Sequence, residues 1–211
     1  MRAEVIVCTL ATCEPYQSSA LALGARLHEL GIRFVYETDS RGEHPWQAKR
    51  FAVQAARALC RNGTVYWVDA DVVVRDPLAC TRLLIPRPRG IHAEWLWTSE
   101  EVRDYRRALG MMASRGAFPS QFPADWLVGY SLADSDAVAF FAAWGSIATD
   151  LSARGFNRPG SVLVSDGLTI GIAAEISGVP LFGDLAEAHE AFDHVSRPER
   201  RRWNHARGVR P

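Results

Sequence analysis

The chain has 211 residues, of which 48% are hydrophobic and 23% are charged, and its 24 basic side chains balance 24 acidic ones. This length and composition suit one globular domain with a sizeable core and exclude a disordered or fibrous protein. No apolar run approaches the roughly 18 residues of a membrane span, and no signal-peptide pattern is present. We therefore expect a soluble, cytoplasmic protein whose four cysteines are reduced thiols.

The N-terminal third alternates between strand and helix patterns. Strands are expected at residues 4–9, 32–37 and 64–69, and helices at residues 15–30 and 45–61. Gly31 should end the first helix, and Pro45 suits the first turn of the second. The strand-helix-strand-helix-strand order predicts an α/β fold with a Rossmann-like, mostly parallel central sheet flanked by helices.

Beyond residue 80 the pattern loosens. We expect strands at residues 90–97 and 127–132, helices at 98–113, 134–154 and 165–178, and a loop at 114–125. Asp134 and Ser165 stand where the last two helices should begin, and both residue types cap helix N-termini. The prediction is a single domain with an irregular C-terminal third.

Asp69 and Asp71 follow a β-branched and aromatic segment, Thr64 to Val68, with the composition of a buried strand. In an extended chain their carboxylates would share one side and repel each other unless a cation lay between them. They fall at the carboxyl end of the third strand, where open α/β sheets bind ligands. A solvated strand end or a turn is the plainer interpretation, because helix capping explains a second D-x-D at residues 134–136.

Five segments of the chain together match the pattern of one enzyme family. They are VYWVDADVVVRDPL, PWQAKRFAVQAA, DWLVGYSLADSDAVAFFAAW, SDGLTIGIAAEISGVP and WNH. In this combination they resemble the GT-A-fold, nucleotide-sugar-dependent glycosyltransferases, although Leu127-Val128-Gly129 lacks the asparagine that usually precedes the long helix. The resemblance implies one GT-A-like domain over residues 1–211, with a nucleotide-binding half at 1–80, an acceptor-side half at 90–195 and a basic tail at 196–211.

The resemblance also implies a reaction and its metal. A sugar would move from a nucleoside diphosphate, with UDP favoured, to a hydroxyl acceptor. A bound Mn²⁺ or Mg²⁺ would neutralise the diphosphate as the bond breaks, and such ions take one or two carboxylates plus substrate phosphates. Asp71 would ligate the metal directly, Asp69 would do so through water or hold the ribose, and His205 would add a ligand.

The remaining site residues are also implied by the resemblance. Asp166 would be the catalytic base, and its place in the first turn of a helix should lower its pKa. Donor contacts are expected from Thr9, Ala11, Thr12, Asp39 and Lys49. Each residue has a plainer alternative: a strand-to-helix turn for the first three, a turn cap for Asp39, solvation for Lys49, a helix cap for Asp166 and a surface position for His205.

The tail from residue 196 onward contains six arginines and one glutamate. These arginines either fold over the donor diphosphate or bind nucleic acid, and a glycosyltransferase acting on modified bases in DNA would need both. The sequence pI near 7.0 is far from that of a typical nucleic-acid-binding domain.

Two other enzyme classes fit less well. A haloacid-dehalogenase-type phosphohydrolase would place the D-x-D on its first strand with a lysine after it, whereas two strands and the single lysine, Lys49, precede it here. A nucleotidylyltransferase would have a glycine-rich loop after the first strand, and TLATCEPY contains no glycine.

Overall fold

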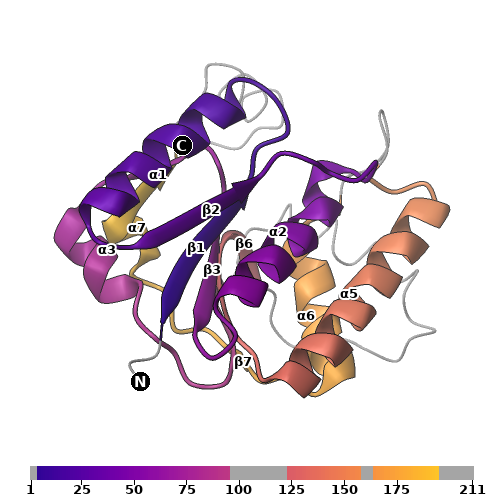
Figure 1. Cartoon of the computed structure of the whole chain (residues 1–211). Coiled ribbons are helices and arrows are strands. Elements are labelled where there is room, and N and C mark those ends of the chain that lie inside the picture. Colours follow the sequence, from indigo (N-terminus) through magenta and orange to yellow (C-terminus); the bar gives the residue numbers. More distant parts are fainter. Residues whose placement is uncertain (1–3, 96–122, 158–163, 195–211) are drawn as a thin grey trace.

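The computed structural model describes residues 4–95, 123–157 and 164–194, and this part of the chain is an α/β structure (Figure 1). Its strands are β1 (Val5–Leu10), β2 (Arg33–Glu37), β3 (Thr64–Val68), β4 (Val72–Val74), β5 (Gly90–Trp95), β6 (Pro123–Ser131), β7 (Leu181–Phe182) and β8 (Phe192–His194). Its helices are α1 (Tyr16–Glu29), α2 (Pro45–Leu59), α3 (Pro77–Leu83), α5 (Asp134–Ala153), α6 (Asp166–Ser177) and α7 (Ala188–Ala191). The helix expected at 98–113 lies outside the described residues.

The central sheet has six strands in the order β2-β1-β3-β6-β5-β7. Strand β1 is parallel to β2 and β3, and β5 is parallel to β7, whereas β6 runs antiparallel to both of its neighbours. The prediction of a mostly parallel sheet flanked by helices is confirmed. A second, two-stranded sheet pairs β4 with β8.

Helices cover both faces of the sheet, with α2, α5 and α6 on one side and α1, α3 and α7 on the other (Figure 1). In β3, Val65 and Trp67 pack in the core on the side of α2, α5 and α6, and Tyr66 and Val68 pack in the core on the side of α1, α3 and α7. Because successive side chains point to opposite faces and both faces are covered, every β3 side chain is buried. This explains why the sequence of the strand is almost entirely apolar and does not alternate with polar residues.

Local signals set most of the helix ends. Gly31 and Gly178 follow α1 and α6 with φ of 71° and 70°, the left-handed region that glycine tolerates. Pro45 opens α2, and the hydroxyl of Ser165 accepts from the Gly167 N–H at the start of α6. One boundary prediction was wrong: β6 begins at Pro123, inside the expected loop, because proline is tolerated as the first residue of a strand.

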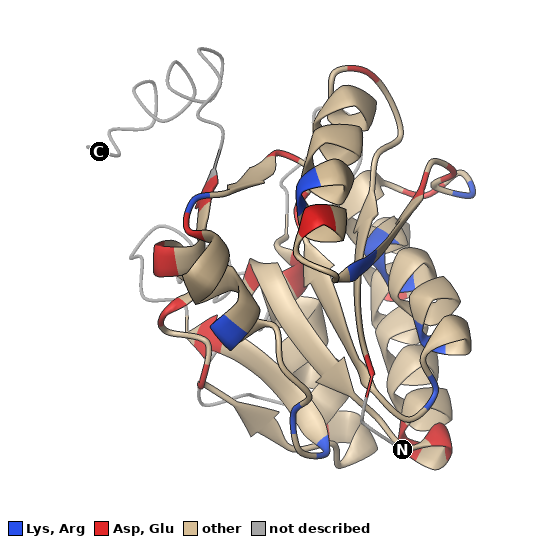
Figure 2. Cartoon of the chain, turned by 60° about the vertical axis from the view of Figure 1, so that its left-hand side comes forward, with Lys and Arg blue, Asp and Glu red and all other residues tan. Residues whose placement is uncertain are grey.

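The second D-x-D corrects another prediction. The N-cap residue of α5 is Ala133, with no side-chain capping bond, so Asp134 and Asp136 lie in the first turn of the helix. They form ion pairs instead, Asp134 with Arg57 at 2.6 Å and Asp136 with Arg89. In the view of Figure 2, acidic and basic residues are interspersed over the described elements.

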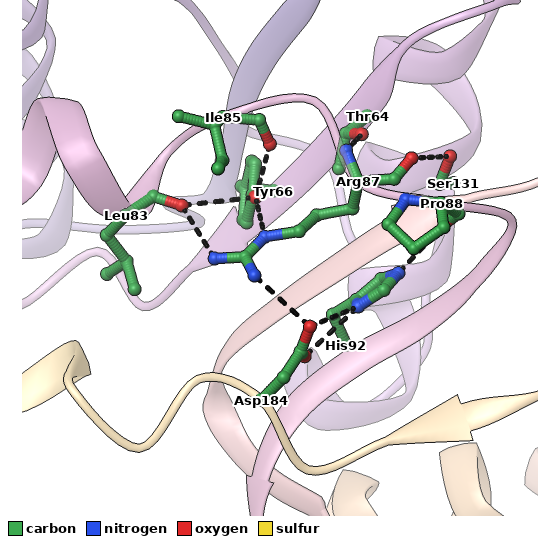
Figure 3. Close-up of polar contacts among 9 residues, drawn as sticks. All are labelled: Thr64, Tyr66, Leu83, Ile85, Arg87, Pro88, His92, Ser131 and Asp184. Carbon is green, nitrogen blue, oxygen red and sulfur yellow. Dashed lines mark hydrogen bonds and ion pairs between the residues drawn. The ribbon is translucent and has the colours of Figure 1, made fainter.

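A polar network holds the amino-terminal end of β3 to the segment before β5 (Figure 3). Arg87 donates to the Tyr66 hydroxyl and to the Asp184 carboxylate, each at 3.1 Å, and its backbone N–H donates to Thr64 Oγ1 at 2.8 Å. The buried ring of His92 lies 2.9 Å from the same carboxylate. These contacts satisfy polar groups at the end of β3 opposite to Asp69.

Two further expectations concern the whole chain. The four cysteines are free thiols, as predicted, with Cys13 exposed and the other three buried. None of the described helices has the length and apolar character needed to cross a lipid bilayer.

Candidate active site

A cavity of about 230 Å³ lies at the carboxyl ends of β1 and β3. Its walls come from the segment after β1, the start of α2 and the end of β3. The lining residues are Leu10, Thr12, Cys13, Tyr16, His44, Pro45, Trp46, Lys49, Trp67, Asp69, Ala70 and Asp71. The two aspartates of the D-x-D and the single lysine of the chain therefore meet at the edge of the sheet where α/β folds bind ligands.

The D-x-D forms a turn rather than an extended strand end. Strand β3 ends at Val68, and the Val72 N–H then donates to the Asp69 carbonyl at 3.2 Å. The turn interpretation is therefore correct, and the extended geometry is not. The interpretation of the D-x-D as a solvated strand end is wrong for Asp71, which is only 4% exposed. Both Asp69 and Asp71 nevertheless line the cavity.

Lys49 is the centre of the polar contacts behind this turn. Its Nζ lies 3.0 Å from Asp69 Oδ1, 2.9 Å from Asp166 Oδ2 and 3.4 Å from the Asp125 carbonyl oxygen. It also lies 5.0 Å from the centre of the Trp67 ring. The residue is 7% exposed, so the alternative of a solvated helix-face lysine is wrong.

Burial controls the ionisation of this group of residues. Burial raises the pKa of Asp166 to about 8, and the Lys49 ammonium offsets only part of that effect. Burial alone would lower the pKa of Lys49, but the carboxylates of Asp166, Asp69 and Asp125 together raise it well above its usual value. The predicted lowering of the Asp166 pKa was wrong, because the carboxyl group has no exposed surface to solvate its charge.

Trp67, Asp125 and His44 are among the site residues that the sequence reasoning missed. Trp67 Nε1 donates to Asp69 Oδ1 at 3.1 Å, and Asp125 Oδ2 accepts from the Ser165 hydroxyl at 2.7 Å. His44 is the N-cap of α2, with Nδ1 accepting from the Trp46 N–H at 3.3 Å. Of these residues, only His44 could have been placed from the sequence, because it directly precedes Pro45, which marks the start of a helix.

The other expected donor contacts divide between two environments. Thr12 lines the cavity. Thr9 and Ala11 have no exposed surface and are not among its lining residues. Asp39 is exposed, and its carboxylate accepts from the Arg41 N–H at 2.7 Å, so it caps a turn as its alternative interpretation predicted. His205 and the arginine-rich tail lie outside the described residues.

The carboxylates of the cavity fit a hard divalent ion that shares its ligands with a substrate. Within the described ranges, no group of three or more His, Cys, Asp or Glu side chains is arranged to hold a metal ion. Magnesium-type ions need only one or two carboxylates when substrate phosphates and water supply the remaining oxygens. Asp69 and Asp71 provide that donor set on one wall of the cavity.

Comparison with known proteins identifies the fold. No protein-family model and no curated protein matches the chain. Among solved structures it is similar to a glycosyltransferase involved in the glycosylation of the major capsid of PBCV-1, with a TM-score of 0.56 and 14% identity over 96% of this chain and 98% of that chain. An alignment with Drosophila beta-1,4-galactosyltransferase 7, in complex with manganese, UDP-Gal and xylobiose, has a TM-score of 0.45 and 10% identity over 94% of this chain and 73% of that one. The chain has a GT-A-type fold, as the sequence resemblance predicted.

Proposed function

We propose that this chain is a metal-dependent glycosyltransferase that moves a sugar from a nucleoside-diphosphate sugar to a hydroxyl acceptor. The observation that carries the proposal is that Lys49, Asp69 and Asp71 line one cavity at the carboxyl ends of β1 and β3. The shared fold with a solved glycosyltransferase supports it. The preference for UDP as the nucleotide rests on the sequence resemblance.

In this proposal Asp69 and Asp71 hold a Mn²⁺ or Mg²⁺ ion together with the donor diphosphate. When bound, such an ion neutralises the diphosphate and the charge that develops on the leaving nucleotide. The carboxylate of Asp69 is already oriented in the protein, because Lys49 and Trp67 both donate to its Oδ1. Holding the side chain in one orientation before the substrate arrives reduces the cost of ordering it.

Lys49 supplies a fixed positive charge beside the same carboxylate. Its ammonium stays protonated at neutral pH, because neighbouring carboxylates raise its pKa. A fixed positive charge on a side chain that is only 7% exposed stabilises a diphosphate more than the same charge in water. We assign Lys49 to the donor diphosphate for this reason.

Asp166 receives a positioning role in the proposal. A general base must reach the proton that it accepts, and Asp166 has no exposed surface and does not line the cavity. Its Oδ2 lies 2.9 Å from the Lys49 ammonium. We therefore propose that Asp166 holds Lys49 in place, and that the base for the acceptor hydroxyl is another group.

The division of the chain is also part of the proposal. The described residues that line the cavity fall between Leu10 and Asp71, which supports residues 1–80 as the nucleotide-binding half. The acceptor-side half would be residues 90–195. The arginines of residues 196–211 would close over the donor diphosphate, with nucleic acid as their alternative partner.

The test is a thermal-shift panel of UDP, UDP-sugars and GDP-sugars with and without Mn²⁺, on the wild type and on Asp71→Asn. Binding to the native state must raise Tm. We expect a Mn²⁺-dependent rise with UDP and UDP-sugars in the wild type. We expect no such rise in Asp71→Asn, which should still fold. An equal rise in both proteins would show that the D-x-D does not hold the metal and donor.

A further inference from the structure

A second cavity, of about 670 Å³, lies between the start of α2 and the end of α5. The residues of its wall that matter here are Glu43, His44, Gln47, Thr149, Ser152 and Asn157. His44 and Pro45 line this cavity and also the one that contains the D-x-D turn, so the two cavities meet at the start of α2. In Figure 1, the start of α2 and the end of α5 lie at the same end of the molecule.

Gln47 carries a buried side chain without a hydrogen-bond partner among the described residues. The residue is 3% exposed, and within the described part of the chain neither its Oε1 nor its Nε2 has a hydrogen-bond partner. A carboxamide offers two donors and an acceptor oxygen, and buried groups of this kind are normally satisfied. Both amide atoms are covered, and a turn of the side chain toward the cavity that Gln47 lines would offer them to a ligand that both donates and accepts hydrogen bonds.

The other polar groups that the structure describes on this wall carry no free positive charge. Among the described residues that line the cavity there is no lysine or arginine, and the carboxylate of Glu43 is paired with Arg50. His44 is neutral at neutral pH, because burial lowers its pKa. Since its Nδ1 accepts from the Trp46 N–H, its Nε2 carries the ring proton. A phosphate would find no unpaired cation among the described lining residues, whereas a neutral molecule with several hydroxyls would find both donors and acceptors.

We propose that this second cavity binds a neutral saccharide as the acceptor of the transfer reaction, and that the Gln47 amide pairs with its hydroxyl groups. The inference rests on the proposed function and names the substrate class of the second half of the reaction. The volume lies within the roughly 300–1,000 Å³ of small-molecule sites. The shared wall at His44 brings a saccharide in this cavity next to a donor held at Asp69 and Asp71.

The experiment compares the wild type, Gln47→Leu and the control Gln54→Leu. Gln54 is an exposed glutamine on the same helix and does not line the cavity. Saturation-transfer NMR would measure binding of the methyl glycosides of glucose, galactose, mannose and xylose, and calorimetry would measure binding of UDP with Mn²⁺. Gln47→Leu should weaken saccharide binding at least ten-fold and leave UDP affinity unchanged, and Gln54→Leu should match the wild type in both.

The melting temperature separates a ligand-binding amide from a structural one. Removing a buried polar group that has no partner leaves no desolvation cost behind, so Gln47→Leu should melt at the same temperature as the wild type or higher. A lower Tm would assign the amide to the core and overturn the proposal. If the leucine variant fails to fold, Gln47→Met, which keeps the unbranched shape, takes its place.

The remaining outcomes distinguish this inference from the proposed function. A wild-type protein that binds UDP with Mn²⁺ but none of the four glycosides would overturn the acceptor site and leave the proposed function standing. Unchanged glycoside binding in Gln47→Leu, or a loss of UDP binding in that variant, would also overturn it. A wild type that binds no nucleotide would contradict the proposed function itself.

Discussion

Replacing Lys49 by methionine tests whether the buried charges behind the D-x-D turn act as one unit. Removing one partner of a buried ion pair typically costs about 3–5 kcal/mol of unfolding free energy, because the remaining charge loses its compensation. The cost here should depend on pH, because burial raises the pKa of Asp166 to about 8. Below that pH Asp166 stays neutral without the lysine, and Asp69, with a side chain 18% exposed, is the main group to lose a partner.

The sign of the pH dependence follows from the proton on Asp166. The folded wild type keeps this proton up to about pH 8, whereas the unfolded chain releases it near 3.8. Wild-type stability should therefore fall as pH rises between these values and level off above them. Lys49 lowers the Asp166 pKa, so without it the fall continues to higher pH. The free energy of unfolding of Lys49→Met should therefore keep falling by about 1.4 kcal/mol per pH unit after that of the wild type has levelled off. The difference between the two unfolding free energies should widen by about 2 kcal/mol between about pH 8 and 9.5.

Urea unfolding followed by tryptophan fluorescence, at about pH 6.5, 8 and 9.5, measures this difference. The control is Arg57→Met, on the same helix, which removes the partner of the exposed Asp134. That variant should show no widening over the same range. A difference in unfolding free energy between Lys49→Met and wild type that stays constant with pH would refute the coupling of Lys49 to Asp166.

Three other changes test the positioning residue, the tail and a helix end. Asp166→Asn should weaken Mn²⁺-dependent UDP binding measured by calorimetry, since it removes the carboxyl group that holds Lys49. If Asp166 were instead the general base, the variant would lose roughly 10²-fold or more in transfer rate and keep its UDP affinity. Deleting residues 196–211 should weaken UDP-sugar affinity, and a truncation that loses only DNA affinity would contradict the assignment of the tail to the diphosphate. Gly178→Ala should lower the unfolding free energy by about 1–2 kcal/mol, because its φ of 70° is costly for alanine, and an unchanged urea midpoint would contradict this.

The order of the elements was predictable because the signals that set them are local. Gly31 and Gly178 stop helices through their own backbone freedom, and Pro45 and Ser165 mark helix starts. The apolar run before Asp69 identified a strand buried on both faces. The place of the D-x-D at a strand end followed from these elements, which is why the cavity could be located from the sequence.

The electrostatics of the site could not be predicted in the same way. Asp125 and Ser165 are 40 residues apart, and only the packing of α6 against β6 brings their side chains to 2.7 Å. A helix N-terminus favours a carboxylate, but complete burial of Asp166 outweighs that preference and raises its pKa. The pairing of Asp134 with Arg57 in place of capping likewise depends on how α5 packs beside α2.

The structure explains why an arginine-rich chain has its single lysine at position 49. Three oxygens surround the Lys49 ammonium, one from each of three elements: the end of β3, strand β6 and the start of α6. An ammonium has three donors around one point, whereas a guanidinium presents a flat fork that matches a single carboxylate, as Arg50 does with Glu43. Convergent oxygens from three elements therefore favour a lysine. The same contact ties the D-x-D turn to α6, so the group proposed to meet the donor diphosphate is also the one that fixes the shape of its site.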